Sequence, residues 1–506
     1  MRTDTTPAPR PPFGRLLVAN RGEIAIRVIR ACRDLGISPI AVYSDADVRA
    51  LHVRLADRAE HIGPAAASSS YLSVPSVVDA ALRSGAEAVH PGYGFLSENA
   101  DFARAVEAAG LVFVGPPADA IEALGNKLAA RRSVAAAGVP IVPGTTVALE
   151  DDVTDVVNLG FPVMLKAAAG GGGRGMRRVE HLNDLADAMA SARREAEAAF
   201  GDGTVYVERL ISPARHIEVQ LLGDRQGGLA VLGERDCSVQ RRHQKLVEES
   251  PSPGIGDETR TALFESARRV ASTIEFHNAA TVEFLVDTDG NHYFLEMNTR
   301  LQVEHGVTEL VTGLDLVAWQ IRVAAGERLT ADVLEALPRG HAIEVRLYAE
   351  DPADGFRPVA GRVGAWRLPD GPGVRVDAGV ESGTDLPPEY DPLLAKLMVQ
   401  ADDRPAAVAR LRRALDETVI GGIQTDAGFL RWLADQPAFV SGTYDTGFIG
   451  THWGDGGPPL SAEDRELAAL AAIAGREMRS EGPPRPSPGA RSSAWARAAR
   501  RDGLRQ

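Results

Sequence analysis

The sequence predicts a multidomain protein that combines α/β and α+β domains. Its 506 residues are long for one domain and suggest two to four. Strand-like and helix-like segments alternate over residues 15–114, which is typical of a parallel sheet covered by helices on both faces. Residues 281–298 instead contain two strand-like runs joined by a short turn, as in an antiparallel hairpin. A hydrophobic content of 44% is enough for sizeable cores.

Charge and cysteine usage narrow the function classes. A net charge of −14 argues against broad binding to nucleic acid or to anionic membranes. The chain has no run of 18 or more apolar residues, so we expect no membrane-spanning helix. Residues 1–12 lack an apolar run and are predicted to be a disordered tail, not a secretory signal. Cys32 and Cys237 are too few for a disulfide framework, which favours a reducing, cytoplasmic location.

The N-terminal segments follow a β-α-β rhythm. Strands are predicted at 15–19, 39–43, 88–90 and 111–114, and the first helix at 23–35. The turn after the first strand contains one glycine, so the Gly-x-Gly-x-x-Gly fingerprint of NAD-binding proteins is absent. The loop at 91–94 follows a strand, at the sheet edge where ligands usually bind in open α/β sheets.

A glycine run marks the next part of the chain. Lys127 begins a predicted helix, and a short strand over 161–166 ends at Lys166. Four glycines follow at 170–173, with Arg174 after them. Such a run is unsuited to a helix or strand, but its backbone N–H groups can close over phosphate oxygens. No Gly-Lys-Ser/Thr follows, so it is not a Walker A loop. A flexible linker remains the alternative.

Two strands and a basic stretch come next. Glu208, at the end of a strand over 204–211, could bind ribose hydroxyls or an adenine edge, and a capping or solvated role fits equally well. His216 begins a strand over 216–222, where a structural role is the simpler interpretation. Residues 234–245 carry five basic side chains, which suits a small anion or a phosphate. The alternative for this stretch is a solvated charged loop.

The hairpin at 281–298 contains the strongest chemical signal. Asp289-Gly290 predicts a two-residue type I′ turn, and this register places Glu283 opposite Glu296. Asn298 would lie on the same face, and Leu285 and Phe294 would share it. Two carboxylates roughly 5 Å apart repel each other unless a cation such as Mg²⁺ or Mn²⁺ lies between them. A solvated hairpin with two outward acids is the alternative.

The C-terminal third reads as mixed strand and helix. Strands are predicted at 339–346, 361–368 and 374–379, with a turn at 349–354. In the stretch 390–398, Asp391 is predicted to cap a following helix, with Lys396 nearby. Residues 482–506 are rich in Pro, Ser and Arg and are predicted to be a basic disordered tail.

Together these segments resemble the biotin carboxylases, the ATP-grasp subunits of biotin-dependent carboxylases, over about residues 15–450. The resemblance is carried by residues 19–25, 90–99, 170–176, 234–245 and 294–305. It implies a Rossmann-like N-terminal domain (13–123), an ATP-grasp domain (124–338) with a glycine-rich lid at about 140–205, and an α+β C-terminal domain (339–450). Residues 1–12 and 451–506 would be tails, largely disordered.

The resemblance also implies site residues. Positions that match the ATP contacts are Lys127, Lys166, Gly172, Gly173, Glu208, Arg209, Ile211, His216, Gln240 and His243. The metal ligands would be Glu283, Glu296 and Asn298, in agreement with the hairpin argument. The bicarbonate and biotin site would contain Lys245, Arg300, Gln302, Val303, Glu304 and Arg346. Two departures from the family pattern are Ala169, where another glycine is frequent, and Arg209, where lysine is frequent.

The implied activity is ATP-dependent carboxylation of biotin with bicarbonate through carboxyphosphate, with Glu304 as general base and Arg300 as the fixed cation. The cofactors would be ATP, Mg²⁺ or Mn²⁺, and biotin as a carrier-bound substrate. No lysine is flanked by methionine on both sides, so biotin is expected on a separate biotin carboxyl carrier protein. A carboxyltransferase subunit of an acetyl-CoA or acyl-CoA carboxylase and a homodimer partner are also implied. Another ATP-grasp ligase of the carbamoyl-phosphate type, or a catalytically silent scaffold, remain the alternatives.

Overall fold

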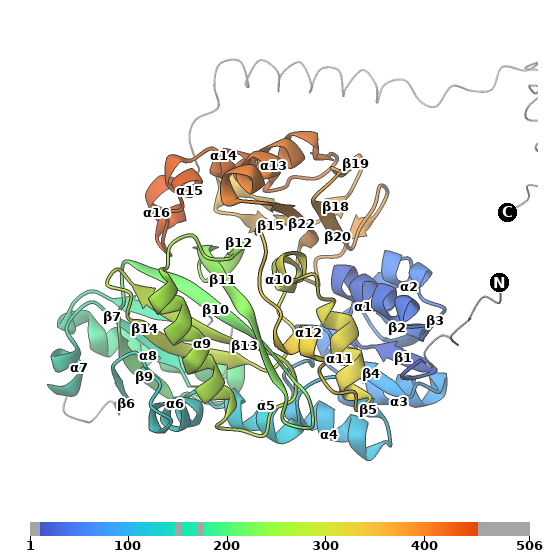
Figure 1. Cartoon of the computed structure of the whole chain (residues 1–506), viewed down its shortest axis with the longest axis horizontal. Coiled ribbons are helices and arrows are strands. Elements are labelled where there is room, and N and C mark those ends of the chain that lie inside the picture. The colour runs from blue at the N-terminus through green and yellow to red at the C-terminus, as the bar shows by residue number, and fades with distance from the viewer. Residues whose placement is uncertain (1–10, 147–153, 169–175, 454–506) are drawn as a thin grey trace, which may run out of the picture. The chain divides into compact units, whose positions relative to one another are not determined.

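The computed structural model describes residues 11–146, 154–168 and 176–453 (Figure 1). All of them belong to one compact unit, Met1–Asp455. The predicted glycine run and the predicted C-terminal tail lie outside the described residues. None of the helices formed by the described residues is both long and apolar enough to span a bilayer.

The N-terminal part contains a five-stranded parallel sheet of order β3-β2-β1-β4-β5. Its strands are β1 (Arg15–Val18), β2 (Ser38–Ser44), β3 (Arg58–Gly63), β4 (Ala88–His90) and β5 (Val112–Phe113). Helix α1 (Gly22–Asp34) contributes to the core on one face, whereas α3 (Val74–Ser84) and α4 (Ala100–Ala108) contribute to the core on the other. The predicted doubly covered sheet is therefore confirmed. The prediction missed β3, a half-exposed edge strand with little apolar signal.

A smaller antiparallel sheet follows, with the order β6-β9-β7-β8. It consists of β6 (Gly144–Thr146), β7 (Val163–Ala167), β8 (Arg177–Val179) and β9 (Val205–Arg209). Helices α7 (Thr154–Leu159) and α8 (Leu185–Phe200) accompany it, and they share an apolar core with its strands. This sheet carries Lys166 on β7 and Glu208 on β9, in the pair of strands at its centre.

An eight-stranded antiparallel sheet holds most of the site, in the order β14-β13-β10-β11-β12-β15-β22-β20. Its strands are β10 (Ala214–Gly223), β11 (Leu229–Arg241), β12 (Gln244–Ser250), β13 (Asn278–Asp287), β14 (His292–Asn298), β15 (His341–Tyr348), β20 (Val374–Ala378) and β22 (Leu393–Ala401). Because β12 pairs with β15, the sheet runs through both sides of the predicted boundary at residue 338. Helix α9 (Asp257–Ala271) packs on the strands β10 and β13 (Figure 1).

The basic stretch 234–245 lies inside this sheet. It occupies most of β11, a tight turn and the start of β12. Arg235 is 0% exposed, and Glu234 and Asp236 are also buried. A solvated charged loop is therefore wrong for most of this stretch and describes only the exposed turn residues Arg242 and His243. The structure instead buries charged residues in a strand, which requires partners for each of them.

The hairpin has the predicted pairing but not the predicted turn. Glu283 lies opposite Glu296, as expected. The amide of Gly290 donates to the carbonyl of Asp287, so the connection has three residues with Gly290 in the left-handed region (φ 83°), and a type I′ turn is wrong. A bulge at Leu295 restores the register further along the strands.

The same bulge corrects the predicted neighbours of Glu283. Phe294 lies opposite Phe284, and both belong to the apolar core under the other face of the sheet. Phe294 therefore does not share the face of Glu283 and Glu296. Leu285 is half-buried and lies opposite Tyr293.

The remaining elements complete the unit. The helices are α2 (Leu51–Leu55), α5 (Ala118–Gly125), α6 (Lys127–Ala136), α10 (His305–Thr312), α11 (Leu316–Ala324), α12 (Ala331–Leu334), α13 (Arg404–Glu417), α14 (Ala427–Ala434), α15 (Pro437–Ser441) and α16 (Phe448–His452). Short strands are β16 (Glu350–Asp351), β17 (Arg357–Pro358), β18 (Gly361–Arg362), β19 (Trp366–Arg367), β21 (Asp385–Leu386) and β23 (Val419–Ile420). The strand predicted at 361–368 is thus two short pieces. The helix predicted after Asp391 is wrong, because β22 follows and Asp391 accepts a hydrogen bond from the amide of Leu393 at 2.9 Å.

Candidate functional site

Lys245, at the start of β12, is the centre of a buried polar network. Its Nζ lies 2.7 Å from Glu218 Oε2, 3.1 Å from Glu283 Oε1 and 2.7 Å from Glu304 Oε1. These acids come from β10, from β13 and from the residue before α10. Burial alone would lower the pKa of the Lys245 ammonium, but the surrounding acids hold that pKa well above its usual value. Lys245 is therefore a permanent cation to which three parts of the chain are bound.

Glu304 is one of the buried carboxylates of this network and is bound by two cations. It is 1% exposed, and its second oxygen, Oε2, accepts a hydrogen bond of 3.0 Å from Arg346 Nη2 on β15. Burial alone would raise the pKa of this carboxyl, but the charges of Lys245, Arg346 and Arg235 hold the pKa well below its usual range. In this structure Glu304 is therefore ionised and is bound to both Lys245 and Arg346.

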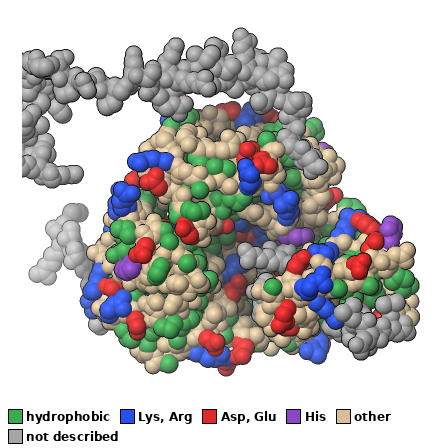
Figure 2. Space-filling view, turned by 180° about the vertical axis from the view of Figure 1, so that it is seen from behind, with side chains coloured by type: hydrophobic (Ala, Val, Ile, Leu, Met, Phe, Trp, Pro, Cys, Tyr) green, Lys and Arg blue, Asp and Glu red, His purple; other side chains and the backbone are tan. Residues whose placement is uncertain are grey.

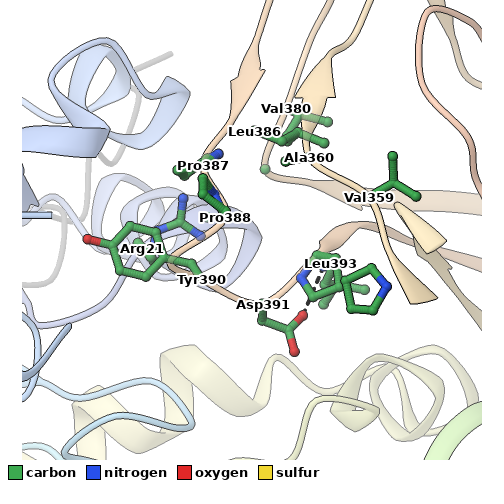
Figure 3. A pocket seen from close by; sticks show the side chains of 14 residues that line it. Arg21, Val359, Ala360, Val380, Leu386, Pro387, Pro388, Tyr390, Asp391 and Leu393 are labelled. Carbon is green, nitrogen blue, oxygen red and sulfur yellow. Dashed lines mark hydrogen bonds between the residues drawn. The ribbon is translucent and has the colours of Figure 1, made fainter. Parts of the chain in front are cut away.

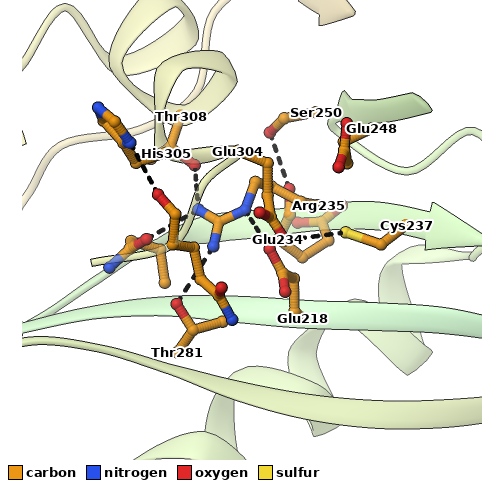
Figure 4. A network of polar contacts seen from close by, with 12 residues as sticks. Glu218, Glu234, Arg235, Cys237, Glu248, Ser250, Thr281, Glu304, His305 and Thr308 are labelled. Carbon is orange, nitrogen blue, oxygen red and sulfur yellow. Dashed lines mark hydrogen bonds and ion pairs between the residues drawn. The ribbon is translucent and has the colours of Figure 1, made fainter. Parts of the chain in front are cut away.

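Glu218 and Arg235 belong to the same network, and Figure 4 shows both of them close to Glu304. Arg235 Nε donates to Glu218 Oε1, and its other nitrogens donate to Gln220, Thr281 and Thr308. The sequence analysis missed Glu218. A signal was present, because His216, Glu218 and Gln220 alternate along one strand and so point to one face.

Three buried side chains of this network have the chemistry of metal ligands. Glu218, Glu304 and Cys237 offer ligand atoms that lie within 4.8 Å of one another. Lys245 contacts both carboxylates, however, and its ammonium already supplies the positive charge there. Glu218 and Glu304 are therefore the anionic wall of the lysine site and not metal ligands, and Cys237 is a neutral thiol beside them because burial raises its pKa well above the usual value.

The hairpin acids fit a hard divalent cation by their chemistry. Glu283 and Glu296 project from opposite positions of β13 and β14, and Asn298 donates to Glu283 Oε1 at 2.8 Å. Each acid now has a lysine partner, since Lys127 Nζ lies 3.0 Å from Glu296 Oε2 and Lys245 contacts Glu283. Two carboxylates and an amide oxygen are the ligand types that Mg²⁺ and Mn²⁺ prefer. The two lysine contacts show that the Glu283–Glu296 pair binds positive charge.

The segment between β14 and α10 carries the remaining predicted anion-site residues. Arg300 Nε donates to Glu98 Oε2 at 2.9 Å, and its Nη1 donates to Gln302 Oε1 at 2.7 Å. Gln302 in turn donates to Glu283 Oε1 at 2.9 Å. The carbonyl of Val303 accepts a hydrogen bond of 2.7 Å from Lys396. This segment therefore bends over the hairpin acids, and Arg300 and Glu304 belong to one connected cluster.

The predicted ATP contacts lie around the small sheet and the β11–β12 turn. Lys166 Nζ is 2.6 Å from Glu208 Oε2, and Arg131, which the sequence analysis missed, donates to the other oxygen of Glu208. His216 Nε2 lies 2.7 Å from Glu283 Oε2, so this histidine belongs to the polar cluster.

The positions of four other predicted ATP contacts are described by strand pairing, backbone angle and burial. Gln240 lies opposite Lys245 in the β11–β12 pair, and His243 occupies the turn with φ 67°. The side chain of Arg209 is exposed, and Ile211 is half-buried. Gly172 and Gly173, together with the predicted closing glycine flap, lie outside the described residues.

A cavity of about 280 Å³ lies apart from this network (Figure 3). Arg21, Tyr390 and Asp391 line it together with apolar residues, among them Val359 and Leu386, and none of the network residues lines it. The guanidinium of Arg21 lies 4.3 Å from the Tyr390 ring centroid and pairs with Asp47 at 2.7 Å. Asp391 is thus a cavity-lining residue. On the face shown in Figure 2, basic and acidic side chains are interspersed.

Comparison with known proteins identifies the family. Three family models match: "Biotin carboxylase, N-terminal domain" over residues 12–121, "Carbamoyl-phosphate synthase L chain, ATP binding domain" over 126–332, and "Biotin carboxylase C-terminal domain" over 344–451. The chain is 48% identical over 440 residues to a biotin carboxylase of Nostoc sp., a match that covers 86% of this chain and 98% of that protein.

A longer relative and a relative of known structure support the same family. The chain is 50% identical over 472 residues to methylcrotonoyl-CoA carboxylase subunit alpha of Oryza sativa subsp. japonica. That match covers 91% of this chain but 64% of the rice subunit, so the chain spans about two thirds of that relative. The biotin carboxylase domain dimer of Hydrogenobacter thermophilus 2-oxoglutarate carboxylase, solved with MgADP, ADP and bicarbonate, superposes with a TM-score of 0.83 at 45% identity. It covers 87% of this chain and 98% of that one.

These matches confirm the predicted architecture of a Rossmann-like part, an ATP-grasp part and an α+β C-terminal part. They extend over nearly all of the described residues, at identities far above those at which a fold alone is shared. The chain therefore belongs to the biotin carboxylase family of ATP-dependent ligases.

Proposed function

We propose that this chain catalyses the ATP-dependent carboxylation of biotin with bicarbonate, using the residues of the lysine-centred network. The observation that carries the proposal is the buried Glu304 carboxylate, held by Lys245 and Arg346 beside the Glu283–Glu296 pair. A base, fixed cations and a pair of metal-type carboxylates on adjoining elements are what phosphoryl transfer to a weak nucleophile requires.

The ATP phosphates would lie against two lysines. Lys127 and Lys166 now pair with Glu296 and Glu208, and each would exchange its acid for phosphate oxygens when nucleotide binds. Glu283, Glu296 and Asn298 would hold Mg²⁺ or Mn²⁺, which neutralises phosphate charge when bound. The solved Hydrogenobacter relative with MgADP supports this assignment. Further nucleotide contacts are proposed for Gly172, Gly173, Glu208, Arg209, Ile211, His216, Gln240, His243, Gln302 and Val303.

Bicarbonate activation would use the network itself. Lys245 and Arg300 orient the bicarbonate anion, and Glu304 removes its proton, so that the oxygen attacks the γ-phosphorus and ADP leaves. The products of this step are carboxyphosphate and ADP. Arg300→Ala should lower turnover at least about 100-fold, the scale of losing one fixed charge donor.

Transfer to biotin would follow in the same site. Carboxyphosphate breaks into CO₂ and phosphate, and the phosphate takes the proton from the ureido N1′ of biotin. N1′ then attacks CO₂, while Arg300 stabilises the negative ureido oxygen and Arg346 stabilises the anionic intermediate. Both guanidiniums are held by acids, Glu98 and Glu248, which keeps them fixed in place.

The wider assembly is also a proposal. We infer that biotin arrives on a separate carrier protein and that a carboxyltransferase subunit of an acetyl-CoA or acyl-CoA carboxylase uses the product, in the cytoplasm. A homodimer is supported by the dimeric Hydrogenobacter relative. The division into domains at 13–123, 124–338 and 339–450 belongs to the same proposal, as does the lid at about 140–205.

One coupled assay tests the function. ADP release by the purified chain should require bicarbonate and rise with free biotin, and labelled bicarbonate should appear in carboxybiotin. ADP release that is independent of both would contradict the proposal. The match of residues 126–332 to a carbamoyl-phosphate synthase domain favours one second candidate. Ammonia-dependent ADP release without biotin would support that candidate, and no ATP cleavage at all would support a silent scaffold.

A further inference from the structure

Two glutamates lie opposite each other next to Arg346, and one of them, Glu344, has no role assigned above. Glu248 on β12 and Glu344 on β15 are directly opposite each other in the antiparallel pair, which places their Cβ atoms roughly 5 Å apart. Both residues are 0% exposed. Two carboxylates buried at this distance cannot both be ionised without a cation or a proton between them.

The contacts of the pair are unequal. Glu248 Oε1 accepts a hydrogen bond of 2.7 Å from Arg346 Nε. Its Oε2, and both oxygens of Glu344, have no hydrogen-bond partner among the described residues. Gly306 packs directly over Glu344, since a Cβ there would lie 3.3 Å from Glu344 Oε2 and 2.2 Å from Met398 Sδ. Three acceptor oxygens of this opposed pair are therefore buried without a partner among the described residues, and Gly306 packs closely on Glu344.

Among the described residues no basic side chain forms an ion pair with Glu344, although Lys396 is the cation that acts most strongly on it. Lys396 faces it from β22, but its Nζ donates to the carbonyl of Val303 and pairs with Glu23. Arg346, on the same strand as Glu344, is bound to Glu248 and Glu304. The remaining titratable groups that face Glu344 are Glu248 from β12 and Glu304 and His305 at the start of α10, and none of these adds a fixed positive charge.

We propose that Glu344 is a neutral carboxylic acid that donates a hydrogen bond to the free oxygen of Glu248, and that this acid–carboxylate pair positions Arg346. Glu248 then remains ionised against the Arg346 guanidinium, and Arg346 remains on Glu304. The pair shares a single proton, so no other reactant is involved. The catalytic consequence rests on the proposed function, whereas the protonation of Glu344 does not.

The electrostatics agree with the geometry. Burial raises the pKa of Glu344 well above its usual value; the charge of Lys396 opposes this effect, and the charge of Glu248 adds to it. Burial also raises the pKa of Glu248, to about 7, although Arg346 opposes the change. The direction is the same for both acids because burial disfavours the ionised form of each, and one proton on the pair leaves only one of them charged.

Infrared spectroscopy and thermal unfolding test the protonation directly. The difference spectrum between the unmodified chain and Glu344→Gln at neutral pH should contain the C=O stretching band of a protonated carboxylic acid. The folded-state pKa of Glu344 lies above its unfolded value, so the stability of the unmodified chain falls as pH rises between those two values. As pH rises from 5 to 8, the melting temperature of Glu344→Gln should therefore increase relative to that of the unmodified chain. A missing band, or a difference that is flat or shrinks with pH, would overturn the proposal.

Turnover tests the positioning role. Glu344→Leu removes the donor and should lower kcat by up to about 100-fold through displacement of Arg346, with a smaller change in KM for ATP. Glu344→Gln, whose amide can donate to the same oxygen, should restore most of that kcat. Met398→Leu, a volume-conserving change beside Glu344, is the matched control and should keep kcat near normal. Equal losses in all three variants would refute the positioning role. If the unmodified chain lacks biotin-dependent ATP cleavage, the proposed function fails, and the infrared and unfolding results still decide the state of Glu344.

Discussion

Replacing Glu304 by glutamine tests the central chemical assignment. Glutamine keeps the size and one acceptor oxygen of the side chain but cannot take a proton from bicarbonate. A positioned general base contributes roughly 10²- to 10⁴-fold to a rate, which corresponds to about 2.7–5.4 kcal/mol. We therefore expect bicarbonate- and biotin-dependent ADP release by Glu304→Gln to fall at least about 100-fold.

The variant should remain folded, although it loses stability. Removing one partner of a buried ion pair typically costs about 3–5 kcal/mol. Here each cation keeps another acid, since Lys245 still contacts Glu218 and Glu283, and Arg346 still contacts Glu248. The cost should therefore lie near the lower end of that range, and circular dichroism and thermal unfolding at the assay temperature check it.

Glu249→Gln is the matched control for this experiment. Glu249 is equally buried and is also bound by two basic side chains, His341 and Arg404, but it contacts none of the lysine-centred network. If lost activity were only the result of a broken buried ion pair, both variants would lose turnover alike. Near-normal turnover by folded Glu304→Gln would refute the assignment of Glu304 as base.

The pH dependence adds a second, independent check on Glu304. Lys245 and Arg346 hold its pKa well below the usual range in the free protein, so Glu304 stays ionised at ordinary pH. The profile of kcat/KM for bicarbonate, corrected for the titration of bicarbonate itself, should have no acid limb from Glu304 above about pH 5. Bound bicarbonate shares Lys245 and should raise the basicity of Glu304, so any such limb should appear in kcat at higher pH than in kcat/KM. An acid limb near neutrality in kcat/KM that disappears in Glu304→Gln would contradict this reasoning.

Three further predictions concern metal, pH and the hairpin turn. Glu296→Ala should raise the Mg²⁺ concentration for half-maximal ADP release at least about tenfold. Asp289 is an exposed acid of the same hairpin, and Asp289→Ala should leave that concentration unchanged. Equal Mg²⁺ titrations of the two variants would argue against the metal site. Burial would raise the pKa of Glu249, but hydrogen bonds from His341 and Arg404 lower it to about 2. Its ionisation therefore stabilises the fold above pH 4.5, and this contribution is lost as pH falls toward 2. Glu249→Gln should lose about 3 kcal/mol of unfolding free energy at pH 7, and denaturant titrations at several pH values should show the difference from the unmodified chain decrease in acid. Gly290→Ala forces a side chain into the left-handed region and should cost about 1–2 kcal/mol of unfolding free energy while turnover persists, a result that a comparison with Thr288→Ala will check.

Much of the site was predictable because strands place every second residue on one face. The metal-type pair follows from this rule, and so would Glu218, had the alternation in β10 been followed from His216 to Gln220. The basic stretch was predicted from its run of basic residues instead. Arg235 was harder to interpret. A run of charged residues in a sequence usually indicates solvent, and only the tertiary structure shows that Glu218, Gln220, Thr281 and Thr308 together satisfy a guanidinium that is 0% exposed.

Glu344 shows where sequence reasoning ends. Its strand reads as alternating, with Glu344 and Arg346 on one face, which favours a pair along the strand. The structure pairs Arg346 with acids from β12 and from the start of α10, 98 and 42 residues away in sequence. A protonated glutamate therefore depends on long-range strand order, and no local pattern contains that information.

The hairpin explains why a wrong turn still gave the right pair. A three-residue loop alone would shift the register by one residue, and Glu296 would then face the apolar core opposite Val282. The core requires Phe294 opposite Phe284, where the two rings meet edge to face with centroids 6.4 Å apart. The site requires Glu296 opposite Glu283. Both demands are met only if one residue is left unpaired between them, and the bulge at Leu295 does this. The packing of Phe294 in the core and the bulge at Leu295, and not the turn sequence, therefore fix the position of Glu296.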